Sequence, residues 1–403
     1  MRYTNRSTII YRSNANTMTK RKILIWLCGI TALYIVLFLV QSFSDTLVPE
    51  PAPQSATNYH APQRSAHEIT LVATGDLLIH STVFRAAQTD EGWDFDPMFR
   101  SVAPFLSQAD SAICHLETPL SPDNTNLSGY PVFNVPNQLA STIANVGYDS
   151  CSLASNHTTD TGIRGIEGTI TALDEAGVSH HGMARDPEEA QNLNILTVDD
   201  FTIAHLSYTY GLNTGVLKPE LQHQTNIIDV ATIIDDAQRA RESGADFVLI
   251  SLHWGNEYQQ QPSAYQTERA TALLNNDAID MIIGHHAHVI QPIDVINEKY
   301  VAYGLGNFLS DQTPKGCNCP KGVEDGVMLF ITLAPNDNQQ LAVKQLNYIP
   351  TYVKRPGFEI IPIISPQNQD EEESAQRTKN ALHSLGVEIP LRTPGAQPTT
   401  TNQ

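Results

Sequence analysis

Apolar and polar residues alternate in two ways along the middle of the chain. Short apolar runs, several of them rich in β-branched residues, predict strands, and amphipathic stretches of about 10–15 residues predict helices. The predicted strands cover residues 69–74, 111–115, 149–153, 247–252, 279–283, 300–303 and 327–333. The predicted helices cover residues 97–108, 136–146, 163–176, 230–243 and 264–275. Strands that alternate with helices indicate parallel crossover units, and therefore an α/β fold.

The longest apolar run lies near the beginning of the chain. Residues 23–40 carry no charged side chain, and these 18 residues are just enough for a helix to cross about 30 Å of hydrocarbon. Lys20, Arg21 and Lys22 directly precede the run, so the positive-inside rule keeps residues 1–22 in the cytoplasm and sends the rest out. We therefore expect a transmembrane signal-anchor at residues 23–42 and a single-pass protein of the cell membrane. The alternative is a cleaved signal peptide, although the run exceeds the usual ~7–15 apolar residues of a signal core.

Composition divides the rest of the chain into three parts. Residues 43–68 are rich in Pro and Ala and indicate a semi-extended linker. Residues 69–365 contain the predicted strands and helices and are expected to form the folded domain. Residues 366–403 are polar and acidic, which is typical of a solvated, disordered tail with one short helix.

Charge is distributed unevenly. The formal net charge is −19, but residues 1–44 contain six basic and no acidic side chains, so residues 45–403 carry −25. A surface of that charge repels nucleic acid and anionic lipid headgroups, and we expect no nucleic-acid partner. It also repels an anionic polymer, unless metal ions, salt or a local basic patch neutralise the contact.

Four cysteines lie in the part that is expected outside the cytoplasm: Cys114, Cys151, Cys317 and Cys319. An oxidising compartment permits disulfides, but four cysteines in so long a chain do not make a disulfide scaffold. Cys317 and Cys319 are two positions apart. A strained local bridge and adventitious metal binding are the alternatives, and the favoured interpretation places both residues on a mobile loop.

Polar residues that can bind metals follow the ends of the predicted strands. They are Asp76, Glu117, Asn156, His157, His253 and His286. Each has an ordinary structural explanation when taken alone, because an Asp after a strand often caps a helix and short motifs match by chance. The carboxyl ends of parallel strands, however, meet at one edge of a sheet, where α/β proteins bind their ligands. The combination therefore predicts one site.

The residue types suit a pair of divalent cations. Such a pair needs a bridging carboxylate, flanking oxygen and nitrogen ligands, and open positions for water and substrate. We expect Glu117 to bridge, with Asp76 and His288 on one metal and Asn156, His253 and His286 on the other. His157 is then left to stabilise or protonate a leaving oxygen. The mixed ligands suit Mn, Fe or Zn. His80 and His115 are interpreted as structural residues.

Several segments jointly resemble the CapA family of poly-γ-glutamate capsule synthesis proteins, a branch of the calcineurin-like metallophosphoesterases. The similar segments are TGDLLIH, HLETPLS, ASNHTTDTGIRGIEGTITALDEAG, SLHWGNEY, IIGHHAHVIQP and YGLGNFLSDQ, in family order over residues 69 to 312. The resemblance implies a four-layer αββα sandwich with a metal site at one edge of the paired sheets, and adds His285 and Asn307 as candidate site residues. It also implies membrane-embedded capsule synthesis or export proteins as partners and an anionic polymer or a phosphoester as substrate.

The chain departs from the family pattern at three positions, and from phosphoesterases proper at a fourth. His115 stands where the family usually has Asn, Ser155 also replaces Asn, and Ala287 replaces Pro. Leu78 stands where phosphoesterases proper have a histidine, so the first metal is expected to be held more weakly. Three functions therefore stay open: a metal-dependent hydrolase or transferase, a non-catalytic component of a polymer-export complex, and a secreted phosphoesterase unrelated to capsule.

Overall fold

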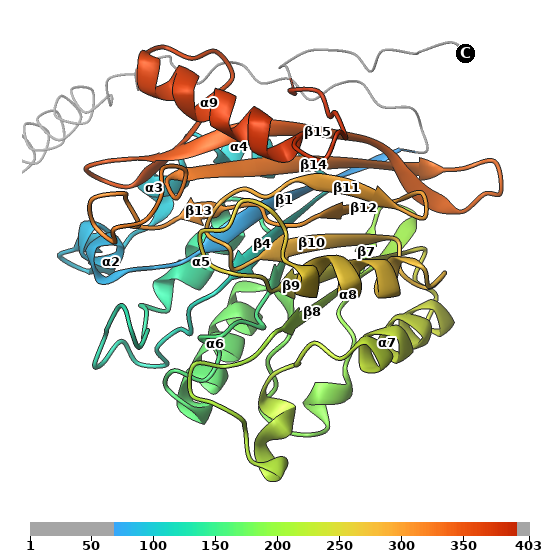
Figure 1. Ribbon diagram of the computed structural model, residues 1–403. Coiled ribbons are helices and arrows are strands. Elements are labelled where there is room, and N and C mark those ends of the chain that lie inside the picture. Colours follow the sequence, from blue (N-terminus) through green and yellow to red (C-terminus); the bar gives the residue numbers. More distant parts are fainter. Residues whose placement is uncertain (1–67, 393–403) are drawn as a thin grey trace, which may run out of the picture. The chain divides into compact units, whose positions relative to one another are not determined.

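The computed structural model describes residues 68–392, which include two β-sheets and the helices that cover them (Figure 1). The predicted cytoplasmic segment 1–22, the anchor 23–42 and nearly all of the linker 43–68 lie outside the described residues. No helix within residues 68–392 is long and apolar enough to cross a membrane.

The larger sheet has eight strands and is built around β1. Its order is β16-β15-β14-β1-β4-β5-β6, and β13 pairs with β1 where β14 leaves it. β1, β4, β5 and β6 are parallel, whereas β14, β15 and β16 run antiparallel to their neighbours. The strands are β1 (Ile69–Leu77), β4 (Ser111–Leu116), β5 (Ser150–Ser152), β6 (Ser179–His181), β13 (Asn307–Leu309), β14 (Asp325–Pro335), β15 (Leu341–Lys354) and β16 (Glu359–Pro362).

The smaller sheet has six strands in the order β11-β12-β10-β9-β8-β7. Its four central strands are parallel, and an antiparallel strand closes each edge. The strands are β7 (Ile195–Val198), β8 (Phe201–Thr209), β9 (Phe247–His253), β10 (Met281–His285), β11 (Ile293–Ile296) and β12 (Lys299–Ala302). A separate hairpin consists of β2 (Gln88–Thr89) and β3 (Gly92–Trp93).

Alternate residues of the central strands point into different cores, and this separates the layers. In β1, Leu71 packs into the core between the two sheets, while Val72 packs against helices on the opposite face. In β9, Leu249 packs between the sheets and Val248 packs against the helices of the smaller sheet. The order of layers is therefore helix, sheet, sheet, helix, as the resemblance implied.

Helices on the larger sheet are α2 (Ser81–Ala86), α3 (Asp96–Phe99), α4 (Ala103–Leu106), α5 (Gln138–Asn145) and α6 (Ile163–Ala176). Those on the smaller sheet are α7 (Val230–Glu242) and α8 (Ala264–Leu274). Short 3-10 turns occupy Glu189–Gln191 and Pro219–Gln224. The single helix predicted for residues 97–108 is wrong: α3 and α4 replace it. Pro104, at the start of α4, has no N–H to continue an earlier helix.

The end of the folded body also differs from the expectation. Helix α9 (Gln369–Leu382) begins at Asn368, whose side chain accepts a hydrogen bond from the Glu371 backbone. Leu382 is fully buried in the core between the sheets, and Arg377 binds the buried Asp325 of β14 through two hydrogen bonds. The prediction of a solvated tail is therefore corrected for residues 366–392, because these contacts make α9 part of the domain.

Candidate metal centre

The candidate site lies where the carboxyl ends of the two sheets meet. Strands β1, β4 and β13 bring Asp76, His115 and Asn307, and β9 and β10 bring His253 and His285. The remaining residues follow directly after strands β4, β5 and β10: Glu117, Asn156, His157, His286 and His288. Every one of these side chains is buried. Residues separated by more than 200 positions thus share one small volume, as the strand ends predicted.

Two glycines allow the strand ends to approach closely. A Cβ on Gly75 would lie 2.0 Å from the carbonyl oxygen of Gly306, and one on Gly284 would lie 1.9 Å from that of Tyr303. Any larger residue would push these backbones apart. Because Gly75 and Gly284 directly precede Asp76 and His285, they set the distance between the first carboxylate and the histidine-rich loop.

Asp76 is the centre of a hydrogen-bonded group. Its Oδ1 lies 3.1 Å from Nδ1 of His285, and its Oδ2 lies 3.1 Å from Nδ1 of His288. The backbone N–H of His286 also donates to Oδ2, at 3.3 Å. Burial opposes the charged carboxylate, but the hydrogen bonds from His285 and His288 outweigh it and lower the pKa of Asp76 below its usual value. Asp76 is therefore a carboxylate ion at neutral pH.

Glu117 has no such partners. It is fully buried, and neither carboxylate oxygen has a hydrogen-bond partner among the described residues. The nearest cationic atom is Nε2 of His288, 3.8 Å from Oε1. Burial is the main reason that the pKa of Glu117 is well above its usual value. An ionised carboxylate in this position costs several kcal/mol, on the order of the penalty for burying one unpaired charge. A bound cation removes that penalty.

The histidines after β10 complete the group around Glu117. Ligand atoms of Glu117, His286 and His288 all lie within 4.8 Å of one another, and Nδ1 of His286 also has no partner in the described region. Burial disfavours a charged His288, yet Glu117 and Asp76 raise its pKa to about 9. The carboxylates therefore attract positive charge. The unpartnered oxygens and nitrogen fit a divalent cation, which supplies that charge without a proton.

Backbone strain marks the same loop. His286 and His288 have φ angles of 86° and 56°, in the left-handed region that non-glycine residues seldom adopt. Such conformations cost about 1–3 kcal/mol each and are found mainly where function requires a fixed geometry. Both residues belong to the group of ligand atoms around Glu117.

Asn156 and His253 form the other side of the centre. The amide oxygen of Asn156 lies 2.9 Å from Nε2 of His253. Neighbouring ligand atoms of a six-coordinate ion, each about 2.1 Å from it, also lie about 3 Å apart. The spacing therefore suits either a hydrogen bond or two ligands of one cation.

His157 lies beside these residues and is held by Asp160. Its Nδ1 is 2.7 Å from Oδ2 of Asp160, which also accepts the Phe133 backbone N–H at 2.7 Å. The edge of the Phe133 ring packs against the imidazole, and the Asn213 amide lies 3.4 Å from both ring nitrogens. These contacts fix the ring and turn Nδ1 toward the Asp160 carboxylate.

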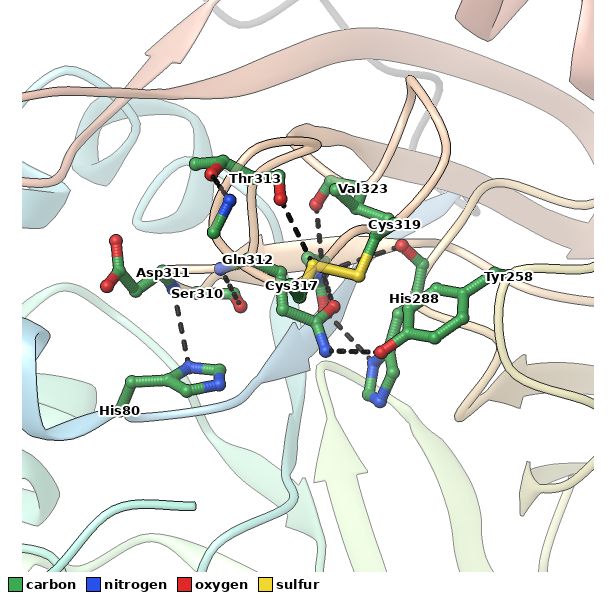
Figure 2. The surroundings of a disulfide bond; sticks show 12 residues. His80, Tyr258, His288, Ser310, Asp311, Gln312, Thr313, Cys317, Cys319 and Val323 are labelled. Atoms are coloured by element: carbon green, nitrogen blue, oxygen red, sulfur yellow. Dashed lines mark hydrogen bonds between the residues drawn. A yellow bond between two sulfur atoms is a disulfide. The ribbon is translucent and has the colours of Figure 1, made fainter. Parts of the chain in front are cut away.

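A disulfide loop borders the centre. Figure 2 shows the Cys317–Cys319 bridge close to His288 and Tyr258. The Asn307 amide lies between the loop and the centre. Its Oδ1 lies 3.1 Å from Nδ1 of His288, and its Nδ2 donates to the side-chain oxygen of Gln312. The Gln312 amide in turn donates to the Tyr258 hydroxyl. The local bridge, one of the two alternatives for this pair, is present, and a second disulfide joins Cys114 to Cys151.

The structure brings together all the residues that the sequence singled out. Asp76, Glu117, Asn156, His157, His253, His286 and His288 lie in one group, with His285 and Asn307 next to them. Their roles as ligands or acid stay predictions. His115 was interpreted as structural only, yet it contacts His253 and stacks on His285 with ring centroids 4.1 Å apart. Sequence reasoning also missed Asp160 and Asn213. The three-residue spacing of His157 and Asp160 was a usable signal, whereas nothing in the sequence indicated Asn213.

The fold and the site define a class: an αββα sandwich with a buried group of carboxylates, amides and imidazoles suited to divalent cations. The family model of the bacterial capsule synthesis protein PGA_cap matches residues 70–312, and the chain belongs to this family. The resemblance to CapA proteins is thereby confirmed.

The chain is also similar to curated relatives and to a solved structure. The capsule biosynthesis protein CapA of Bacillus anthracis is 28% identical over 256 residues, which cover 62% of this chain and 61% of the relative. The PGA biosynthesis protein CapA of Bacillus subtilis (strain 168) is 26% identical over 220 residues, or 54% and 57% of the two chains. The matches thus span about three-fifths of each relative. The calcineurin-like phosphoesterase YfkN from Bacillus subtilis aligns with 80% of this chain and 99% of its own, at 15% identity and a TM-score of 0.45.

Proposed function

We propose that this chain is a membrane-anchored, extracytoplasmic protein of poly-γ-glutamate or capsule polymer synthesis or export, and that it uses a two-cation centre to hydrolyse or transfer a bond of its substrate. One observation carries the proposed chemistry: Glu117 is fully buried with both oxygens unpartnered, among His286, His288 and Asp76. The family of the chain supports the biological setting.

The residues of the centre have distinct tasks. Asp76 and His288 would hold one cation and Asn156, His253 and His286 the other, with Glu117 between them. When bound, Mn, Fe or Zn ions supply positive charge that stabilises negative charge developing on the substrate. His285 keeps Asp76 in place through its 3.1 Å contact, and Asn307 does the same for His288.

His157 would act as the proton donor. Asp160 accepts its Nδ1–H, so the ring cannot turn, and Nε2 can deliver a proton to a leaving oxygen or nitrogen. Asn213 and Phe133 limit movement of the ring further. General acid catalysis by a group held in this way contributes about 10²–10⁴-fold to a rate.

A cavity beside α2 supports an anionic substrate. About 610 Å³ in volume, it lies between α2, the β2–β3 hairpin and residues 127–132, and Arg85 is the single charged side chain that lines it. Trp93 and Tyr130 supply aromatic surface. Phe133 directly follows this lining in the chain and packs against His157. An isolated cation in so acidic a protein suits a carboxylate or phosphate group.

The compartment is part of the proposal. The apolar run at residues 23–40 and the basic residues before it support a membrane anchor with the folded domain outside. The Cys114–Cys151 and Cys317–Cys319 disulfides support an oxidising environment. In that place, membrane-embedded synthesis or export proteins are the expected partners.

The test uses purified full-length protein in mild detergent, stripped of metal and then supplied with Mn²⁺. Wild type, Glu117→Gln and His157→Ala are assayed on poly-γ-glutamate and on an aryl phosphate. We expect metal-dependent cleavage by the wild type and loss of cleavage in both variants, with metal retained by His157→Ala. Cleavage of the aryl phosphate alone would favour a phosphoesterase unrelated to capsule.

A non-catalytic role is the second candidate. Leu78 occupies the position of a phosphoesterase histidine, and its buried side chain offers no ligand. In that case neither substrate is cleaved with any metal. His157→Ala would then leave polymer output by cells unchanged, whereas removal of residues 1–44 would abolish it.

A further inference from the structure

A second imidazole lies behind His253. The two nitrogens of the His253 ring have different neighbours: Nε2 faces the Asn156 amide oxygen at 2.9 Å, and Nδ1 lies 2.9 Å from Nε2 of His115. On its other side, Nδ1 of His115 lies 2.8 Å from the Ser152 hydroxyl, which donates to the Cys114 carbonyl at 3.3 Å. These groups form one buried line from the β4 backbone to the centre.

The hydrogens of this line can point in two directions. In one, Ser152 donates to His115, His115 donates to His253, and His253 donates from Nε2 to Asn156. In the other, His253 donates from Nδ1 to His115, His115 donates from Nδ1 to Ser152, and Ser152 donates to the Cys114 carbonyl. Each ring carries one proton in both arrangements, because in either direction it donates from one nitrogen and accepts at the other.

The orientation of the Asn156 amide shows why the second arrangement requires a cation. Its Nδ2 donates to Oδ1 of Asn213 at 3.3 Å, so its oxygen faces His253. With the His253 proton on Nδ1, the lone pairs of Nε2 and of the Asn156 oxygen face each other at 2.9 Å. Two acceptors at that distance repel, unless a cation binds both. Neighbouring ligands of a six-coordinate ion lie about 3 Å apart, so the geometry accommodates one.

We propose that His115 is a positioning residue for the metal centre: it accepts the Nδ1–H of His253 and thereby keeps Nε2 of His253 unprotonated and aimed at a divalent cation beside Asn156. This inference rests on the proposed metal centre. When the cation binds, one proton on each ring moves from Nε2 to Nδ1 and the Ser152 hydroxyl turns from His115 to the Cys114 carbonyl. No proton is gained or lost by the line.

Partners of this kind usually matter for metal affinity. A histidine ligand commonly donates its other N–H to a carboxylate, a carbonyl or water, and loss of that partner lowers metal affinity about 10–100-fold. Here the partner is a neutral imidazole, itself held by a hydroxyl. The role depends on a histidine at position 115.

Two substitutions separate the contacts of His115. Counted along the bonds from Cβ, the polar atoms of Gln fall near the position of Nε2 and those of Asn near the position of Nδ1. His115→Gln therefore keeps an acceptor for His253 and loses Ser152, whereas His115→Asn keeps Ser152 and loses His253. Comparable melting temperatures of the two variants in EDTA would show that both fold.

The experiment measures Mn²⁺ and Zn²⁺ affinity of the full-length wild type and both variants by calorimetry, with nitrogen NMR of ¹⁵N-histidine-labelled protein. We expect His115→Gln to bind within about 3-fold of wild type and His115→Asn to bind about 10–100-fold more weakly. With Zn²⁺ bound, the His253 signals should report a proton on Nδ1. Wild-type affinity in His115→Asn, or a proton on Nε2 of His253 with Zn²⁺ bound, would overturn the role of His115 but not the metal centre. A wild type that binds neither ion overturns the metal centre as well.

Discussion

Nδ1 of His157 and Oδ2 of Asp160 lie 2.7 Å apart, and both side chains are almost completely buried. The contact fixes the orientation of the His157 ring. We predict that Asp160→Asn lowers the turnover number about 10-fold or more with little change in metal content, because the ring loses its orientation while the proposed ligands remain. Metal analysis and initial rates on the same samples check this. Equal turnover in wild type and Asp160→Asn would show that Asp160 does not assist His157.

Asn307 connects the disulfide loop to the centre through His288, Gln312 and the Val323 carbonyl. Asn307→Leu takes the Asn307 partner from the Gln312 side-chain oxygen and the Val323 carbonyl, and leaves Nδ1 of His288 with Asp76 alone. Each buried group that loses its partner costs about 1–3 kcal/mol. We therefore predict a lower free energy of unfolding in EDTA together with weaker Mn²⁺ binding. Gln376→Leu, on the exposed face of α9, is the control, and denaturant titration with and without Mn²⁺ is the measurement. A loss of stability with unchanged affinity would confine Asn307 to a structural role.

Acid should destabilise the metal-free protein through His205. Both its ring nitrogens bond buried hydroxyls, those of Ser150 and Ser251, and burial, followed by repulsion from neighbouring histidines, lowers its pKa to about 3. The unfolded chain takes up this proton near pH 6.5, so the stabilising effect is complete above pH 6.5 and is lost as pH falls toward 3. Between pH 6.5 and 5.5 the loss is about 1 kcal/mol.

His205→Asn removes the titrating ring and tests this prediction. The variant is expected to be less stable at every pH, yet its free energy of unfolding in EDTA should fall about 1 kcal/mol less than that of wild type between pH 6.5 and 5.5. Urea titrations at the two pH values give both quantities. Parallel changes in wild type and variant would show that His205 does not titrate in this way.

Arg85 should strengthen binding of an anionic polymer through the cavity it lines. Arg85→Gln is predicted to weaken binding of a labelled γ-glutamyl oligomer about 2- to 5-fold at low salt, and less at high salt, as expected for one partly exposed charge. Arg100→Gln is a matched control, since Arg100 lines a different cavity beside Asp94 and Asp96. Equal effects of the two substitutions would indicate a general charge effect rather than a binding site.

Much of the fold could be predicted because its signals are local. Short apolar runs and amphipathic stretches place the parallel strands, and residues at strand ends then converge by topology. Strand β8 could not be predicted in this way. Its polar residues His205 and Ser207 are buried and bond Ser150 and the Ala154 backbone, which lie more than 50 positions earlier in the chain. Helix α9 was predicted to lie in a solvated tail because most of its residues are polar or acidic. The sequence gives no sign that Leu382 packs into the core between the sheets.

The site was predictable to the extent that its residues follow strands. Asp76, Glu117 and His253 stand at strand ends, where ligand sites are expected. His115 lies inside β4, where a histidine is usually a packed residue, and its link to His253 depends on how the two sheets stack. Local sequence patterns do not predict how the two sheets pack on each other.

The most direct test of the metal centre is the metal content of purified full-length protein after reconstitution with Mn²⁺, measured by mass spectrometry beside Glu117→Gln and His286→Ala. We predict about two ions per wild-type chain, as a dinuclear site requires, and a large loss in both variants. Metal-free Glu117→Gln should be at least as stable as metal-free wild type, because the substitution removes a buried carboxyl without a partner. Wild-type protein that retains no Mn²⁺, Fe²⁺ or Zn²⁺, or variants that retain as much metal as the wild type, would contradict the account.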